Sequence, residues 1–247
     1  MSARVTGAVA RRVLRQLLRD PRTIALLVLV PALLLTILRG MFDSQPALFD
    51  QIGAPLLGLF PLITMFLVTS IAMLRERTSG TLERLLAMPT AKLDILVGYA
   101  IAFTIAAAVQ LAVISTVAFG LLGLDSARPA VAVAAVGLLN AVLGVCFGLF
   151  VSAFAQTEFQ AVQFMPAFVF PQLLLCGLFV PRDEMAPVLE GISYALPMTY
   201  AYDALARVSD PAPLGARFWV DVTVTATASA WSTPTSSSSA STTAGAR

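Results

Sequence analysis

The feature that most constrains the fold is a series of long apolar runs that carry almost no charge. Each run approaches or exceeds the roughly 20 apolar residues that a membrane-spanning helix needs, and they cover residues 23–42, 52–74, 95–122, 130–154 and 162–180. Only 12% of the 247 residues are charged and 58% are apolar, whereas a soluble domain has about a quarter of its residues charged. The sequence therefore predicts an all-α polytopic membrane protein with one integral membrane domain.

Residues 1–22 precede the first run and predict a cytoplasmic amphipathic interfacial helix. Between residues 4 and 19, apolar side chains recur at helical spacing on one face, and arginines occupy the other. Such a helix lies in the membrane surface with its arginines toward anionic headgroups. The alternative, the basic start of a signal peptide, is weaker because no small-residue cleavage site follows.

Prolines and small residues inside the runs mark candidate pathway or packing positions. A proline in a spanning helix frees a backbone carbonyl that a neighbouring helix or a cavity must satisfy. Two glycines with GxxxG spacing allow close helix packing, although a run so rich in glycine and alanine also produces such a pair by chance. These candidate positions are Pro31, Pro55, Pro61, Asn140, Gly144, Gly148, Pro166 and Pro171.

The distribution of basic residues predicts the orientation in the cytoplasmic membrane. If the N-terminus is cytoplasmic, ten of the sixteen basic residues fall on cytoplasmic segments, which is what the positive-inside rule favours. This multi-pass orientation places residues 75–92 in the cytoplasm. It places the segment 181–217 outside, with Tyr194, Tyr200 and Tyr202 at headgroup depth.

Residues 218–247 form an atypical tail rich in Ser, Thr and Ala. From residue 219 onward there is no Leu, Ile, Met or Phe, and Val220–Ala230 is short and contains Asp221. A sixth span is therefore weak or missing. We expect five spans and an external tail, with a weak sixth helix as the alternative. A frameshifted or truncated reading frame would also produce so abrupt a change of composition.

Between the apolar runs lies one charged segment, Arg75–Pro89, which reads R-E-R-T-S-G-T-L-E-R-L-L-A-M-P. Thr81 is a credible N-cap, Glu83 falls in the first turn and Pro89 ends the helix. The apolar face consists of Leu82, Leu85 and Leu86. A helix of about two turns is marginal alone in water, so its apolar face indicates docking. A cytoplasmic loop whose charges only fix topology fits the residues equally well.

This segment resembles the signature of ABC-2 type transporter permeases, R-E-x-x-x-G-T-L-E-x-L-L-x-x-P, which follows the second span. A second stretch, L-P-M-T-Y-A-Y-D-A-L at Leu196–Leu205, is similar to the family's late external segment. The resemblance extends from the N-terminal helix to about Gly215, and the daunorubicin type of drug and antibiotic exporter is the subgroup it suggests. It implies a transmembrane domain over residues 23–217, six spans and a cytoplasmic C-terminus, from which the tail departs.

The resemblance further implies that a short cytoplasmic coupling helix docks on a separate ATP-binding subunit. The residues implied in this contact are Arg75, Glu76, Arg77, Gly80, Thr81, Leu82, Glu83, Arg84, Leu85, Leu86 and Pro89. The chain would then be the permease subunit of an ABC exporter that moves an amphipathic drug, a lipid or other cargo. Two permease chains would pair as a homodimer within the lipid bilayer, and the partner would bind ATP and Mg²⁺.

The residue inventory excludes several other classes. There is no GxxxxGK[ST] phosphate loop, so ATP hydrolysis belongs to another chain. There is no His, and both cysteines lie in apolar runs, so we expect no metal site. We also expect no cofactor bound by this chain and no nucleic-acid partner. An ion-coupled secondary transporter usually needs acidic groups in mid-membrane, which the predicted spans lack. An embedded enzyme would need a nucleophile and a base close together, and the predicted spans lack a convincing pair. A structural membrane protein and a truncated, non-functional permease stay open.

Overall fold

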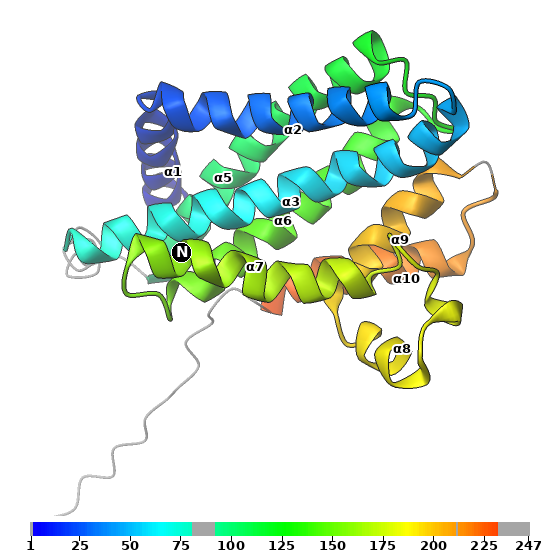
Figure 1. The fold of residues 1–247 in the computed structure, drawn as a ribbon. Helices are drawn as coiled ribbons and strands as arrows, with labels where there is room; N and C mark the ends of the chain where they lie inside the picture. Colours follow the sequence, from blue (N-terminus) through cyan, green and yellow to red (C-terminus); the bar gives the residue numbers. More distant parts are fainter. Residues whose placement is uncertain (1, 81–91, 211, 232–247) are drawn as a thin grey trace, which may run out of the picture.

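A computed structural model describes residues 2–80, 92–210 and 212–231, and these ranges form helices with no strand (Figure 1). The prediction of an all-α polytopic membrane protein is confirmed. Four stretches of helix in these ranges are long and apolar enough to cross a membrane. They are α2 (Pro21–Met41), α3 (Pro46–Thr78), α6 (Ala130–Ser152) and Leu93–Leu121, in which α5 (Lys92–Ser115) continues into the π-helical η1 (Thr116–Leu121).

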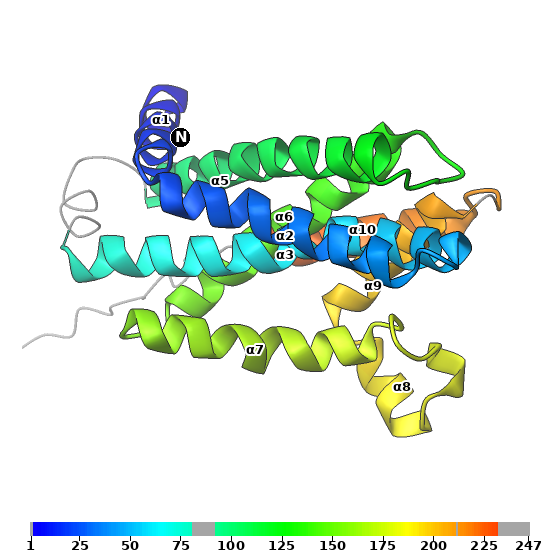
Figure 2. The same cartoon turned by 45° about the horizontal axis from the view of Figure 1, so that its top comes forward.

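The N-terminal helix α1 (Ala3–Leu18) stands at a steep angle to the long helices and packs against α5 near one end of the bundle (Figures 1 and 2). Val9 and Val13 are buried in that contact, as expected of the apolar face. Leu18, which the spacing places on the same face, is instead 70% exposed, because α1 ends there. Arg12 also departs from the expectation, since its side chain turns into the protein and pairs with Glu76.

A helix cap separates α1 from α2. The Asp20 carboxylate accepts hydrogen bonds from the Thr23 backbone N–H at 3.2 Å and from the Thr23 hydroxyl at 2.7 Å. These bonds lower the pKa of Asp20 below its usual range. Because the cap satisfies an otherwise free N–H group, the chain turns sharply and α2 begins at Pro21.

Helices α3 and α6 form the centre of the bundle and are its most buried long helices. Helix α5 packs on α6, and α2 covers α3 and α5. Helix α7 (Glu158–Leu175) runs along α3. The sequence predicts a fifth span over 162–180, but α7 begins earlier and ends at Leu175, because Gly177 adopts a left-handed φ of 97° that turns the chain away.

The segment expected to lie at the outer membrane face contains η2 (Arg182–Glu184), α8 (Pro187–Ser193) and α9 (Pro197–Ser209). Helix α9 does not lie flat on a surface. It packs between α3, α6 and α10, with Ala201, Ala204 and Leu205 fully buried. Tyr194 is 52% exposed, so only part of this segment has the accessibility of an interfacial element.

A further helix, α10 (Ala216–Trp231), packs on α9 and α6. We expected five spans and a tail without a helix here, and the structure instead has the alternative, a sixth long helix. Its polar residues are accommodated because Asp221 pairs with Arg207 at 3.1 Å and the Thr225 hydroxyl donates to the Asp221 carbonyl at 2.8 Å. Its 16 residues fall short of the roughly 20 that a full span needs. Residues 232–247 of the expected tail lie outside the described residues.

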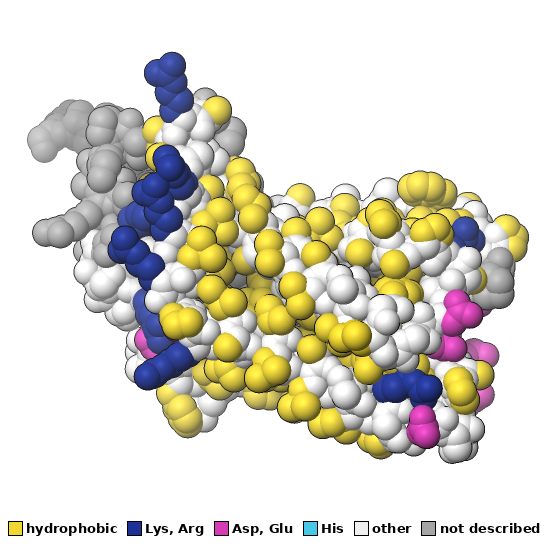
Figure 3. All heavy atoms as spheres, turned by 90° about the horizontal axis from the view of Figure 1, so that it is seen from above, with side chains coloured by type: hydrophobic (Ala, Val, Ile, Leu, Met, Phe, Trp, Pro, Cys, Tyr) yellow, Lys and Arg dark blue, Asp and Glu magenta, His cyan; other side chains and the backbone are white. Residues whose placement is uncertain are grey.

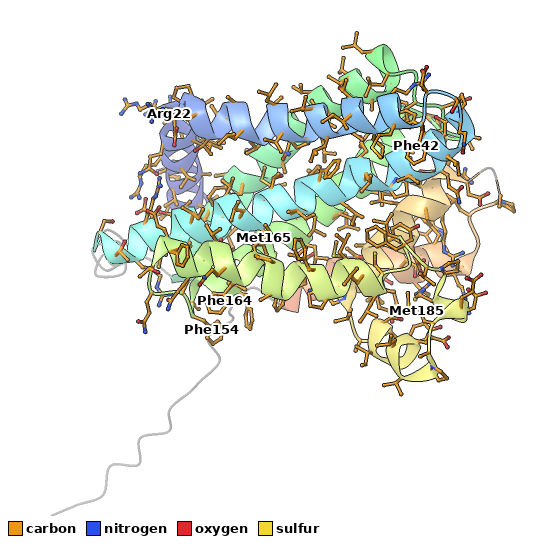
Figure 4. All side chains as sticks on the ribbon, viewed as in Figure 1. Arg22, Phe42, Phe154, Phe164, Met165 and Met185 are labelled. Carbon is orange, nitrogen blue, oxygen red and sulfur yellow. The ribbon has the colours of Figure 1, made fainter. Side chains whose placement is uncertain are left out.

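Charged side chains gather at the two ends of the bundle (Figure 3). Dark-blue basic side chains cluster at the α1 end, the acidic ones in this view lie mostly at the other end, and hydrophobic side chains cover the face between them. Arg22 and Phe42 mark the two ends of α2, with Arg22 pointing away from the bundle (Figure 4). This is the distribution expected of helices that cross a bilayer.

Candidate functional site

The residues expected to couple the chain to a partner begin in the last turn of α3, at the α1 end of the bundle. Arg75, Glu76 and Arg77 are helical, Ser79 is the C-cap, and Gly80 follows with a φ of 67°. A left-handed residue after the C-cap ends a helix, and glycine adopts that conformation without strain. The other expected contact residues lie outside the described residues, namely Thr81, Leu82, Glu83, Arg84, Leu85, Leu86 and Pro89.

Glu76 joins α3 to α1, and Arg12 of α1 continues the contact to α5. Its Oε1 accepts from Arg12 Nη2 at 2.5 Å and from Gln16 Nε2 at 3.3 Å, both on α1. Arg12 Nη2 also donates to the Tyr99 hydroxyl on α5 at 3.2 Å. Glu76 is only 9% exposed, and a buried carboxylate requires this kind of pairing. The charge therefore holds α1 across the end of α3.

Arg75 and Arg77 connect the same turn of α3 to two other helices. Arg75 donates from Nε and Nη2 to the two carboxylate oxygens of Glu158, at the start of α7, at 2.7 and 3.1 Å. This bidentate bond lowers the pKa of Glu158 below its usual range. Arg77 Nη1 donates to the Ser152 carbonyl, at the end of α6, at 2.6 Å. Three consecutive side chains thus tie the end of α3 to α7, α1 and α6.

The proline positions differ in what surrounds them. Pro31 cannot donate to the Leu27 carbonyl one turn earlier in α2. That carbonyl instead accepts from Gln110 Nε2 on α5 at 2.8 Å, and the Gln110 amide also bonds the Thr64 hydroxyl on α3. A buried polar cluster therefore joins α2, α3 and α5 at the point where proline breaks the helix ladder. Pro55 and Pro61 are buried in α3, whereas Pro166 and Pro171 on α7 are more accessible.

The two GxxxG glycines lie where α6 meets α3. A Cβ atom on Gly144 would fall 2.1 Å from the Leu62 carbonyl oxygen, and one on Gly148 would fall 2.6 Å from that of Phe66. The two backbones are therefore in direct contact, as small residues allow. One turn away on α6, Asn140 Nδ2 donates to the Ala201 carbonyl of α9 at 3.1 Å. These residues pack helices together, and none of the three lines the groove between α1, α2, α3 and α5.

Comparison with known families decides what kind of protein carries this arrangement. The family model described as ABC-2 type transporter matches residues 4–208. This range begins at the second residue of α1, ends at the last but one of α9 and includes the whole charged segment. The chain belongs to the ABC-2 type transporter family. The resemblance inferred from the charged segment is thereby confirmed.

Two curated relatives of this ABC-2 type transporter chain have names that describe permeases. The chain is 26% identical over 153 residues to the probable multidrug ABC transporter permease YbhR of Escherichia coli K12, a match that covers 62% of this chain and 42% of the relative. It is 26% identical over 151 residues to the linearmycin resistance permease protein LnrN of Bacillus subtilis 168, covering 61% and 38%. The matches thus span about two fifths of the length of these relatives.

Several residues of this ABC-2 type transporter site escaped the sequence reasoning. From the sequence, Arg12 belongs to the headgroup-facing surface of the N-terminal helix. Gln16 and Gln110 are not candidates from the sequence. A glutamine inside an apolar run was the available signal, because a buried amide in a membrane helix needs a partner. Its partner is 83 residues away in sequence, so only the fold identifies it.

Proposed function

We propose that this chain is the permease subunit of an ATP-driven ABC exporter, driven by a separate ATP-binding subunit that contacts residues 75–89. One observation carries the proposal, namely the family match over residues 4–208, which includes the charged segment and the helices that contact the end of α3. The names of the two relatives, a multidrug permease and a linearmycin resistance permease, support a drug as cargo. The mostly apolar spans also permit a lipid or other cargo.

The contacts at the end of α3 suggest how a partner would drive the helices. Arg75, Glu76 and Arg77 are already bonded to α7, α1 and α6, and Arg12 of α1 continues the contact to α5. We therefore assign them to transmission, and the residues after Gly80 to docking. A displacement of this turn would act on three helices directly and on α5 through Arg12. For transport to follow, the ATP-bound partner must favour one arrangement of these helices over the other.

The proposal includes a pair of permease chains with cytoplasmic N-termini. The basic side chains at the α1 end support the orientation. A continuous apolar stripe on α2 is available to lipid or to a second copy, since Leu26, Leu29 and Leu33 are 62%, 62% and 53% exposed. Homodimerisation would cover part of this stripe.

Coupling is tested by removing charges from the docking segment while leaving the bundle unchanged. The variant is Glu83→Ala with Arg84→Ala, and the matched control is Glu184→Ala with Arg217→Ala, which removes the same two charges from exposed positions outside the segment. Affinity-tagged full-length chain is purified from its native membranes, and co-purifying ATP-binding proteins are identified by mass spectrometry. Efflux of a fluorescent amphipathic dye is then measured in cells.

We expect wild type and the control to retain an ATP-binding protein and to export dye. The segment variant should insert at normal levels but lose both the partner and efflux. An unchanged yield of partner and unchanged efflux in the segment variant would refute the docking role. Absence of any ATP-binding protein from the wild-type preparation would count against the function itself.

A further inference from the structure

A groove of about 590 Å³ lies between α1, α2, α3 and α5. Its long walls are apolar and are formed by Leu26, Leu27, Val30, Leu67, Val68 and Ile71. Its α1 end is polar, with Glu76, Gln16 and Asp20 in the lining and the ring of Tyr99 beside them. An elongated apolar groove with a few polar groups at one end has the character of a site for an amphiphile.

Glu76 is the polar group that most needs a ligand. Its Oε1 is bonded to Arg12 and Gln16, but its Oε2 is buried and has no hydrogen-bond partner among the residues that the structure describes. The Tyr99 hydroxyl accepts from Arg12 and is a neighbour of Glu76, but it does not reach Oε2 with hydrogen-bond geometry. A buried carboxylate oxygen without a donor is unfavourable, so a molecule that brings an N–H or O–H group would be stabilised there.

Two carboxylates and one guanidinium are the charged groups in the groove lining, namely Asp20, Glu76 and Arg75. Both oxygens of Glu158 hold the Arg75 guanidinium. Basic side chains gather at the α1 end of the bundle as a whole, so the preference for a cation rests on direct contact with Glu76. An ammonium group would bring both an N–H donor and an opposite charge to Oε2.

Aromatic rings add to the preference for an ammonium group. Tyr99 and Phe103 both line the groove, one turn apart on α5, with ring centroids 6.4 Å apart. The faces of aromatic rings attract cations, and sites for quaternary ammonium ligands use such rings. The apolar part of the groove extends along α2 from Thr23 to Val30, seven helical rises or about 10 Å, which accommodates an alkyl chain.

We propose that this groove binds an amphiphile with a protonated amine head and a hydrocarbon tail, the ammonium group at Glu76 and the tail between α2 and α3. The site does not depend on the proposed ATP-binding partner, because all of its residues belong to this chain. The same chemistry occurs in membrane lipids with a primary amine head and in soluble alkylamines, and the experiment separates these sources.

The test measures equilibrium binding of radiolabelled decylamine to the full-length chain in nanodiscs of phosphatidylcholine, whose headgroup has no N–H donor. We expect saturable binding that Glu76→Gln weakens by about tenfold or more, since the ligand loses a charge-assisted hydrogen bond. The matched control, Glu184→Gln, changes an exposed carboxylate in η2, outside the groove, and should bind as wild type. Val30→Trp fills the tail region, leaves Glu76 intact and should weaken binding comparably.

Competition identifies the ligand class and its source. Decanol and decyl sulfate should displace decylamine poorly. Displacement on adding phosphatidylethanolamine to the nanodiscs would identify a lipid as the occupant, and its absence would identify a soluble amine. Unsaturable binding, or wild-type affinity in Glu76→Gln, would overturn the proposal. Equal competition by decanol would overturn the assignment of an amine head. If Glu76→Gln does not fold, wild-type affinity in Val30→Trp alone overturns the site.

Discussion

Replacing Gly144 by alanine should destabilise this protein more than the same change at any other glycine of the bundle. The added Cβ would lie 2.1 Å from the Leu62 carbonyl oxygen, whereas real Cβ contacts almost never fall below 3.0 Å, so the two helices must separate by about 0.9 Å. The atoms in the way belong to the backbone, so no side-chain rotation relieves the clash.

The cost follows from how steeply packing energy falls with distance. A gap of about 0.5–1 Å loses about a quarter to a half of the dispersion energy of each contact, and overpacking substitutions typically cost about 1–3 kcal/mol. For a chain of this size each kcal/mol corresponds to about 2–4 °C in Tm. We therefore expect Gly144→Ala to lower the Tm of the purified protein by about 2–12 °C.

A graded series of alanine variants makes the comparison specific. At Gly148 the nearest backbone atom lies at 2.6 Å, so its loss of stability should be second to that at Gly144. At Gly58 the Cβ would meet only the Leu205 side chain, at 2.4 Å, and that side chain can repack. Gly40, on α2, has nothing within 4 Å and serves as the control, with no loss expected. Thermal melts followed by size-exclusion chromatography measure all four. Equal melting of the Gly144 and Gly40 variants would refute the reasoning.

Two further predictions concern polar contacts. Gln110→Leu should lower the Tm because it leaves the Leu27 carbonyl without a donor, at a cost of about 1–3 kcal/mol. Adding Pro31→Ala restores a helical N–H to that carbonyl and should recover part of the loss. Strictly additive changes in Tm for the two substitutions would contradict the pairing. Glu158→Gln should cost under about 1 kcal/mol at neutral pH, because the pair with Arg75 is exposed. The pKa of Glu158 is lowered from 4.5 in the folded state. The stability that the ionised Glu158 contributes is therefore present above that value and is lost as the pH falls below it. A Tm difference between Glu158→Gln and wild type that persists in strong acid would contradict this assignment.

The sequence predicts the helices well and their ends less well. Long apolar runs identify α2, α3, α5 and α6, because lipid leaves few alternatives to a helix. The second run seemed to stop at residue 74, yet α3 continues to Thr78, since Arg75 and Arg77 find partners on neighbouring helices. The sequence also underestimates the helical character of α10, because its polar residues find hydrogen-bond partners. Its Thr and Ser hydroxyls bond back to the helix itself, which hydropathy alone does not register.

The candidate site shows a sharper limit of sequence reasoning. The charged segment pointed correctly to the family, because its spacing of residues is itself the family signature. The partners of Glu76 could not be found in this way. Arg12 and Tyr99 lie 64 residues before and 23 residues after it, and both look like ordinary members of an amphipathic and an apolar helix. Only the packing of α1 across α3 and α5 brings them together.

The bond from Gln110 to the Leu27 carbonyl has a consequence for biogenesis. Helix α2 leaves the ribosome with a backbone carbonyl that its own proline cannot satisfy, and the donor is synthesised 83 residues later. At about 5–20 residues per second, that interval is about 4–17 s. During this time the Leu27 carbonyl has no hydrogen-bond donor, which is unfavourable in the hydrocarbon core of the bilayer. We therefore expect α2 to stay beside the translocon or near water until α5 emerges. The two helices would then enter the lipid as a pair.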